Sequence, residues 1–144
     1  MKLMNVFNYL REVDGQGNHL NYGASYNINT GEFNPNEGYF VSLVGFEKVY
    51  GMPENNNRWQ DVILNFLQKN VWDVIGCSED VFLGFWVHEN RLYIDLSEKI
   101  MDQNEAIRQG YARNQISIYN ANDGTYIYMN KISSDPDLIT DKHY

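Results

Sequence analysis

The alternation of apolar and polar residues is clearest at residues 81–97, VFLGFWVHENRLYIDLS, where it predicts a β-hairpin. Glu89-Asn90 is the expected two-residue turn, because asparagine tolerates the left-handed backbone angles that such turns require. Side chains alternate between the two faces of a strand, so one face collects six large apolar side chains, and we expect it to be core. These residues are Leu83, Phe85, Val87, Leu92, Ile94 and Leu96.

The other face of the predicted hairpin carries aromatic and ionisable side chains, and its role has two interpretations. Cross-strand aromatic and charged pairs ordinarily stabilise a sheet surface that faces solvent or a covering helix. Exposed tryptophan, tyrosine and arginine are also enriched at protein interfaces, which favours a binding platform. A register shift of one residue would exchange the two faces. The expected cross-strand pairs are His88–Arg91, Trp86–Tyr93 and Gly84–Asp95, and all but the glycine are candidate binding residues.

Further strand patterns occur on both sides of this hairpin. Residues 22–29 read as a strand because of their tyrosines and isoleucine, and residues 39–45 are apolar on both faces, which is typical of a central strand. Residues 46–50 are expected to continue that strand after a glycine bulge. A final hairpin joins residues 116–119 to residues 125–129 around an Asp-Gly turn, the strongest turn signal in the chain.

Two segments show the spacing of amphipathic helices. Asn57 is the expected N-cap of the first, with Gln60 three residues later in a weak capping box. Its apolar stripe consists of Trp59, Val62, Ile63, Phe66 and Leu67. Asp102 and Glu105 form the corresponding box of the second helix, which is expected to end near Asn114.

The element order β-β-α-β-β-α-β-β predicts an α+β fold, with one mostly antiparallel sheet and two helices packed on one face. The opposite face is then either open or covered by residues 1–13, which fit a short helix or an edge strand. Residues 71–78 are expected to be a connector packed under the sheet. No repeat or linker interrupts the chain, so residues 1–132 are expected to form a single domain and residues 133–144 a polar C-terminal tail.

Charge narrows the choice of partner. The 144 residues carry 19 acidic and 11 basic side chains, a formal net charge of −8, and no cluster of lysine or arginine. Binding to a phosphate backbone needs a basic patch, so direct nucleic-acid binding is not expected. The acidic excess would steer the protein towards a partner with a basic surface, although high net charge also simply favours solubility.

The single cysteine and the N-terminal residues indicate the cellular compartment in which the protein is expected to act. Cys77 excludes an intramolecular disulfide and fits a reducing cytosol, and its neighbours favour a buried, small hydrophobic role. The first residues lack the features of a signal peptide, and no apolar run approaches the length of a membrane span. We therefore expect a cytoplasmic protein without membrane association.

Signatures of catalytic and metal sites are missing from the sequence. The histidines are isolated, no phosphate-binding loop or G-x-S-x-G elbow is present, and no cofactor or metal is expected. His88 and Asp95 form the best acid–base pair, but the predicted register separates them by Trp86 and Tyr93. A spatial pair of Cys77 with His88 is a weaker alternative.

Three segments carry a resemblance to a class of proteins: NPNEGYFVSLVGFE at residues 34–47, FLGFWVHENRLYIDLSEKIMDQNEAI at 82–107, and ARNQISIYNANDG at 112–124. The chain resembles small acidic proteins encoded on phages and other mobile elements, which share a G-Y-x-V-S strand and a G-x-W hairpin ending in Y-[IV]-D-[VL]-S. A helix followed by N-Q-x-[AS]-I-[YW]-[DN] completes the pattern. The resemblance implies a shared fold and carries over no catalytic residue.

Small acidic proteins of mobile elements are often antagonists of host defence, of the anti-CRISPR or antirestriction type, that occupy a basic channel or an assembly surface. The resemblance therefore implies a non-enzymatic, protein-binding accessory factor that inhibits a host defence nuclease in the host cytoplasm. A structural or assembly protein of a virion is the first alternative. A small hydrolase that uses His88 and Asp95 is the second. The sequence leaves the oligomeric state open.

Overall fold

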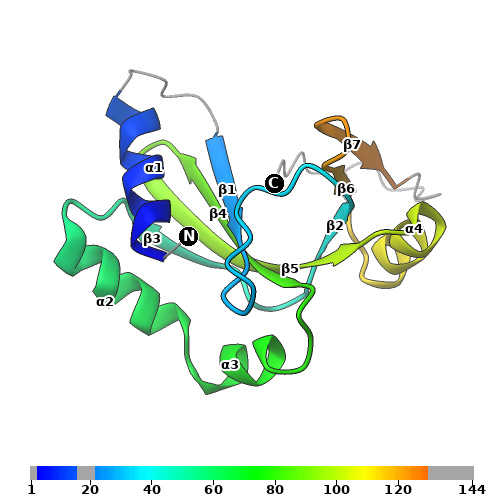
Figure 1. Ribbon diagram of the computed structural model, residues 1–144, viewed down its shortest axis with the longest axis horizontal. Helices are drawn as coiled ribbons and strands as arrows, with labels where there is room; N and C mark the ends of the chain where they lie inside the picture. Colours follow the sequence, from blue (N-terminus) through cyan, green and yellow to red (C-terminus); the bar gives the residue numbers. More distant parts are fainter. Residues whose placement is uncertain (1–2, 16–21, 130–144) are drawn as a thin grey trace.

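An antiparallel sheet of seven strands carries the fold in the computed structural model, which describes residues 3–15 and 22–129 (Figure 1). The strands are β1 (Tyr22–Tyr26), β2 (Tyr39–Ser42), β3 (Lys48–Gly51), β4 (Val81–His88), β5 (Arg91–Ile100), β6 (Ser117–Asn120) and β7 (Thr125–Tyr128). The helices are α1 (Leu3–Gly15), α2 (Asn56–Phe66), α3 (Lys69–Ile75) and α4 (Gln103–Ala112). The predicted α+β class is confirmed, and α1 and α3 join the two predicted helices.

The longest strand, β5, organises the sheet. β4 pairs with one edge of β5, while β3 and β2 pair one after the other with its second edge. The spatial order is β1-β4-β5-β2-β6-β7, with β3 beside the first half of β5. β2 therefore lies between β5 and β6, which confirms the predicted central strand.

The predicted register of the β4–β5 hairpin is confirmed. His88 pairs with Arg91 and Gly84 pairs with Asp95, with the Trp86–Tyr93 pair in between. At the turn, Glu89 and Asn90 have φ angles of 50° and 61°, the left-handed conformation that a primed two-residue turn requires.

Helices α1, α2 and α3 cover the apolar face of this hairpin. The six apolar hairpin residues expected in the core are each at most 3% exposed. Phe7 of α1 stacks on Trp59 of α2 at a centroid distance of 5.1 Å, and Trp59 contacts Phe85 of β4 at 5.4 Å. The N-terminal segment is thus a helix, because its apolar residues recur at helical spacing. It packs on the core face of the sheet and therefore does not cover the opposite face.

Helix α4 extends this helical layer along β2 and β6. Val41 of β2 pairs with Glu98 of β5 and packs with Ala106 of α4 and Ile118 of β6. Gly110 lets α4 approach closely, because a Cβ atom there would lie 3.0 Å from Ile118 Cγ2 and even closer to a methionine sulfur.

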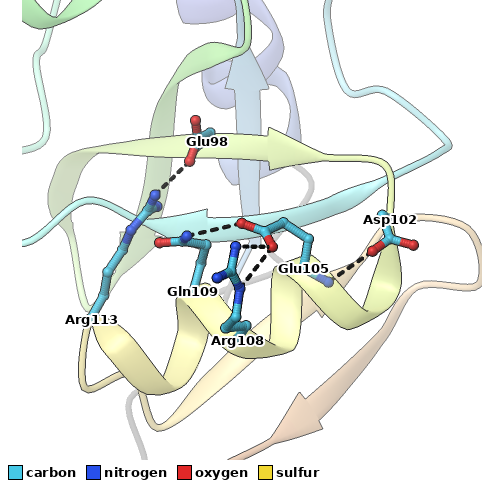
Figure 2. Close-up of polar contacts among 6 residues, drawn as sticks. All are labelled: Glu98, Asp102, Glu105, Arg108, Gln109 and Arg113. Atoms are coloured by element: carbon cyan, nitrogen blue, oxygen red, sulfur yellow. Dashed lines mark hydrogen bonds and ion pairs between the residues drawn. The ribbon is translucent and has the colours of Figure 1, made fainter.

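Polar contacts fix both ends of α4 (Figure 2). Asp102 accepts a hydrogen bond of 2.9 Å from the Glu105 backbone N–H, which confirms the predicted N-cap. The Glu105 carboxylate turns along the helix to Arg108, so only half of the capping box forms. At the other end, Arg113 Nη2 lies 2.5 Å from Glu98 Oε1 and ties the helix to β5.

The prediction for the start of α2 is wrong by two residues. Asn55, in extended conformation, is the N-cap and accepts a hydrogen bond of 2.9 Å from the Arg58 backbone N–H. Three consecutive asparagines compete for this position, and each has the side chain that a cap needs. Sequence alone favours Asn57 because of Gln60, which here is exposed.

The segment predicted as a connector contains helix α3. Val71 and Ile75, one helical turn apart, are buried, whereas Trp72 points outward and is 46% exposed. Cys77 is also exposed, and its thiol donates to the Asp73 carbonyl at 3.0 Å, so the prediction of a buried cysteine is wrong. The apolar residues of this segment (Val71, Trp72, Val74 and Ile75) span little more than one helical turn, which is too short to distinguish a helix from a packed connector.

The strand predicted at residues 22–29 ends earlier, at Tyr26. Asn27 is buried, and its side chain accepts hydrogen bonds from the backbone N–H groups of Asn29 and Thr30, which turns the chain away from the sheet.

The predicted tail at residues 133–144 lies outside the described residues and stays a prediction. Of the helices in the described ranges, none combines the length and apolar character of a membrane span.

Candidate functional site

A pocket of about 430 Å³ lies on the face of the sheet opposite the helices. Strands from both ends of the sheet order line it, from β1 and β4 to β6 and β7, so the sheet curls around the pocket. In Figure 1 these two groups of strands stand on either side of the bend in β5. The lining residues that matter for chemistry are Phe40, Trp86, Tyr93, Asp95, Tyr119 and Tyr126.

Aromatic rings form two walls of the pocket. Trp86 and Tyr93, a cross-strand pair of the hairpin, have centroids 5.4 Å apart at an interplanar angle of 44°. On the other side, Tyr119 of β6 contacts Tyr126 of β7 at 5.3 Å and Phe40 of β2 at 6.4 Å. Such ring contacts hold each wall in a defined orientation.

Asp95 lies between the two walls, at a break in the pairing of β5. The preceding Ile94 pairs with Lys48 of β3, while the carbonyl of Leu96 accepts from the Leu43 N–H. Residues 44–47 therefore bulge out opposite Asp95, with Gly45 at a φ of 93°. This confirms the predicted glycine bulge, although the second strand begins at Lys48 instead of residue 46.

The cross-strand partner of Asp95 is Gly84, and this pairing sets the direction of the carboxylate. A Cβ atom at Gly84 would collide with Asp95 Oδ1, so the carboxylate lies directly over the glycine. Any larger residue at position 84 would displace it. The bulge on one side and the glycine on the other together place a single carboxylate inside the pocket.

Burial raises the pKa of Asp95 from 3.8 to about 7, and the negative charge of Glu47 in the bulge adds to this effect. Within residues 3–15 and 22–129, the Asp95 carboxylate makes no ion pair and accepts no hydrogen bond. In contrast, Lys99 on the same face of β5 is already neutralised by Glu32, with Nζ 2.9 Å from Oε1. Among the described residues, Asp95 is thus a partly buried acid without a compensating charge.

The rim of the pocket is held in place by the segment after β1. Asn34, at a φ of 45°, exchanges hydrogen bonds with Ser25 of β1: its backbone N–H donates to the Ser25 carbonyl, and its side chain accepts from the Ser25 N–H at 2.8 Å. Pro35 lines the pocket beside it. The opening is therefore preformed rather than created by a ligand.

The structure divides the five candidate binding residues into two groups. Trp86, Tyr93 and Asp95 line the pocket, whereas His88 and Arg91 sit at the tip of the hairpin. The His88 ring stacks on Trp86 at 5.3 Å, with an interplanar angle of 13°, and so extends the aromatic surface towards the tip. Arg91 is exposed.

The far wall of the pocket was not predicted from the sequence. Phe40, Tyr119 and Tyr126 reach it through the pairing of β2 with β6 and of β6 with β7. The only sequence signal is the alternation in β6, where Ser117 and Tyr119 flank the buried Ile118. That pattern predicts which side chains of β6 share a face, but not which residues of other strands lie opposite them.

His88 and Asp95 are not placed close enough together to act as an acid–base pair. The pocket reaches Asp95 but His88 does not line it, and the Trp86–Tyr93 pair lies between the two. The alternative pair of Cys77 and His88 is separated by the length of β4, eight residues at about 3.3 Å each. Among the described residues, no group of three histidine, cysteine or acidic side chains is placed to hold a metal ion.

Comparison with known proteins adds no relative: no family model, no curated protein and no solved structure matches this chain. The resemblance to proteins of phages and mobile elements therefore stays a prediction.

Proposed function

We propose that this chain is a non-enzymatic binding protein that holds a partner protein with a basic surface on its pocket face. The observation that carries this proposal is the aromatic-walled pocket, which holds a carboxylate that no described basic side chain pairs with. Tryptophan and tyrosine in such positions are the residues that most often dominate binding energy. The net charge of −8 would accelerate encounter with a basic partner.

The surface extends beyond the pocket, which favours a protein over a small molecule. Tyr93, Trp86 and His88 form a continuous run of contacting rings from the pocket to the hairpin tip. Arg91 lies exposed at the end of this run. A protein can contact both the pocket and the tip at once, whereas a ligand of pocket size leaves the tip unused.

The proposed function includes a cellular location and a class of partner. We propose that the chain acts in the cytoplasm of a bacterial host as an accessory factor of a phage or mobile element. Its partner would be a host defence nuclease, whose basic nucleic-acid channel suits an acidic, aromatic binding face. Support for this setting comes from the sequence resemblance and the charge alone.

Affinity capture with tagged protein tests the binding function. The double variant Trp86→Ala/Tyr93→Ala is expected to keep its fold and to lose the partner that wild-type protein recovers from host lysate, because it removes one pocket wall. Trp72→Ala is the matched control, since Trp72 is exposed on α3 on the other side of the sheet. Equal recovery by the double variant and wild type would refute the proposed surface. A large homo-oligomer with no recovered partner would favour the virion role.

A further inference from the structure

The pocket combines aromatic walls with one carboxylate, and this combination selects ligands by charge. The ring faces of tryptophan and tyrosine attract cations, and Asp95 supplies the opposite charge. Ser42, Ser97 and Ser117 also line the pocket, and their hydroxyl oxygens can accept hydrogen bonds. These groups suit a cation that carries several N–H donors, and they disfavour an anion.

Within the described residues, no lysine or arginine lines the pocket, and Arg91 lies at the hairpin tip. Lys99 points to the same face of β5, but its ammonium lies 2.9 Å from Glu32 and 5.5 Å from the centroid of the Phe82 ring. Arg113 is paired with Glu98 on the helical side of the sheet. An ionised, partly buried carboxylate without a partner is unfavourable, so a cation that enters the pocket would pair with Asp95 without competition from a described basic side chain.

We propose that an arginine side chain of the partner protein enters this pocket, stacks between the aromatic walls and pairs with the Asp95 carboxylate. A guanidinium is preferred to an ammonium because it is planar, stacks on rings and can donate two parallel hydrogen bonds to one carboxylate. The pocket volume of about 430 Å³ lies in the range of sites that enclose a small ligand. This inference rests on the proposed binding function and names the chemical group that the partner presents.

Arginine binding is coupled to the loss of a proton from Asp95. Only the ionised carboxylate pairs with a guanidinium, and the pKa of about 7 leaves Asp95 mostly protonated at pH 5.5. Affinity for a guanidinium probe is therefore about 30-fold higher at pH 8 than at pH 5.5. The other titratable or charged groups on this face are Tyr93, Tyr119, Tyr126, Glu47, the Lys99–Glu32 pair and, at the hairpin tip, His88 and Arg91. The variant His88→Gln separates the contribution of that imidazole.

The test titrates the full-length protein with N-acetyl-arginine methylamide, followed by nuclear magnetic resonance of the Trp86 indole N–H. The neutral citrulline analogue and the lysine analogue serve as competing probes. We expect the arginine probe to bind at least tenfold more tightly than citrulline, and Asp95→Asn to lose at least tenfold in affinity. Asp73→Asn, at an exposed carboxylate on α3, is the matched control and should bind as wild type does.

Each outcome decides a separate point. Equal binding of the citrulline analogue, or unchanged binding by Asp95→Asn, overturns the arginine site. Equal or tighter binding of the lysine analogue overturns the preference for guanidinium. If Asp95→Asn fails to fold, wild-type protein replaces it in the test, and equal affinity for the arginine probe at pH 5.5 and pH 8 overturns the site. If the wild-type protein does not bind the arginine probe but still captures its partner in a Trp86-dependent way, the arginine site is rejected and the proposed function stands.

Discussion

Gly84 and Asp95 form a cross-strand pair in which one side chain is absent so that the other can lie across the sheet. A residue with a Cβ atom is ordinarily the better choice in a strand, because glycine gives up more conformational entropy on folding. The glycine here makes room for a carboxylate whose burial is itself unfavourable. The pair thus reduces stability at two positions, which is typical of a site kept for binding.

Substitution of the glycine should disturb both stability and the site. We expect Gly84→Ala to lower the free energy of unfolding by about 1–3 kcal/mol, because the new methyl group displaces the Asp95 carboxylate. Urea denaturation measures this change. Gly51→Ala is the control, since a Cβ atom at Gly51 meets no atom within 4 Å. Equal stability of the two variants would contradict the close contact at Gly84.

The acid at position 95 should also make stability depend on pH. The folded protein keeps the Asp95 proton up to about pH 7, whereas the unfolded chain releases it near the ordinary pKa of 3.8. The contribution of Asp95 to stability is therefore fully present below pH 3.8 and is lost as the pH rises through 7. This loss amounts to at most about 4 kcal/mol.

Asp95→Asn removes this titration. Relative to wild type, its free energy of unfolding should rise as the pH increases from about 4 to 7 and should stay constant above that, as urea denaturation across this range will show. The control Asp73→Asn should show no such trend. A pH-independent difference between Asp95→Asn and wild type would mean that the carboxylate is ionised throughout.

At the scale of elements, the turns, caps and strand register that depend on local contacts can be predicted from the sequence. The β4–β5 register follows from the alternation of side chains and from an asparagine in the turn, both within one hairpin. The N-cap Asp102 and the bulge at Gly45 were found for the same reason. Helix α3 was missed because its seven residues bury only Val71 and Ile75.

The cap of α4 provides a test at this scale. Asp102→Ala should lower the free energy of unfolding by about 1 kcal/mol, because the Glu105 N–H at the start of the helix loses its acceptor. Asp102→Asn keeps a side-chain oxygen at the same place and should remain close to wild type. Thermal unfolding followed by circular dichroism compares the two. Equal stability of both variants would show that the cap contributes little.

At the scale of the whole molecule, the pocket arises from the curl of the sheet. Its near wall comes from one hairpin, β4–β5, and its far wall from another, β6–β7, joined through β2. The alternation along the hairpin places Trp86, Tyr93 and Asp95 on one face, but nothing in the sequence shows that Tyr119 and Tyr126 lie across from them. Pairing between distant strands and the curvature of a sheet depend on the packing of all layers at once.

This two-walled architecture separates pocket binding from contact at the hairpin tip. Tyr119→Ala/Tyr126→Ala removes rings from the far wall. It should weaken both partner capture and guanidinium binding by about tenfold, since each ring contributes about 0.5–2 kcal/mol to a bound cation. His88→Ala, at the tip, should weaken capture of the protein partner without weakening binding of the small probe at pH 8.

Tyr111→Ala is the control for both measurements, because Tyr111 is 46% exposed on α4, on the helical side of the sheet. Binding isotherms for the probe and for the recovered partner, measured with the same three variants, distinguish the possible arrangements. If the far-wall variant kept full affinity for both ligands, only the hairpin would carry binding. The curl of the sheet would then serve the packing of β6 and β7 and not recognition.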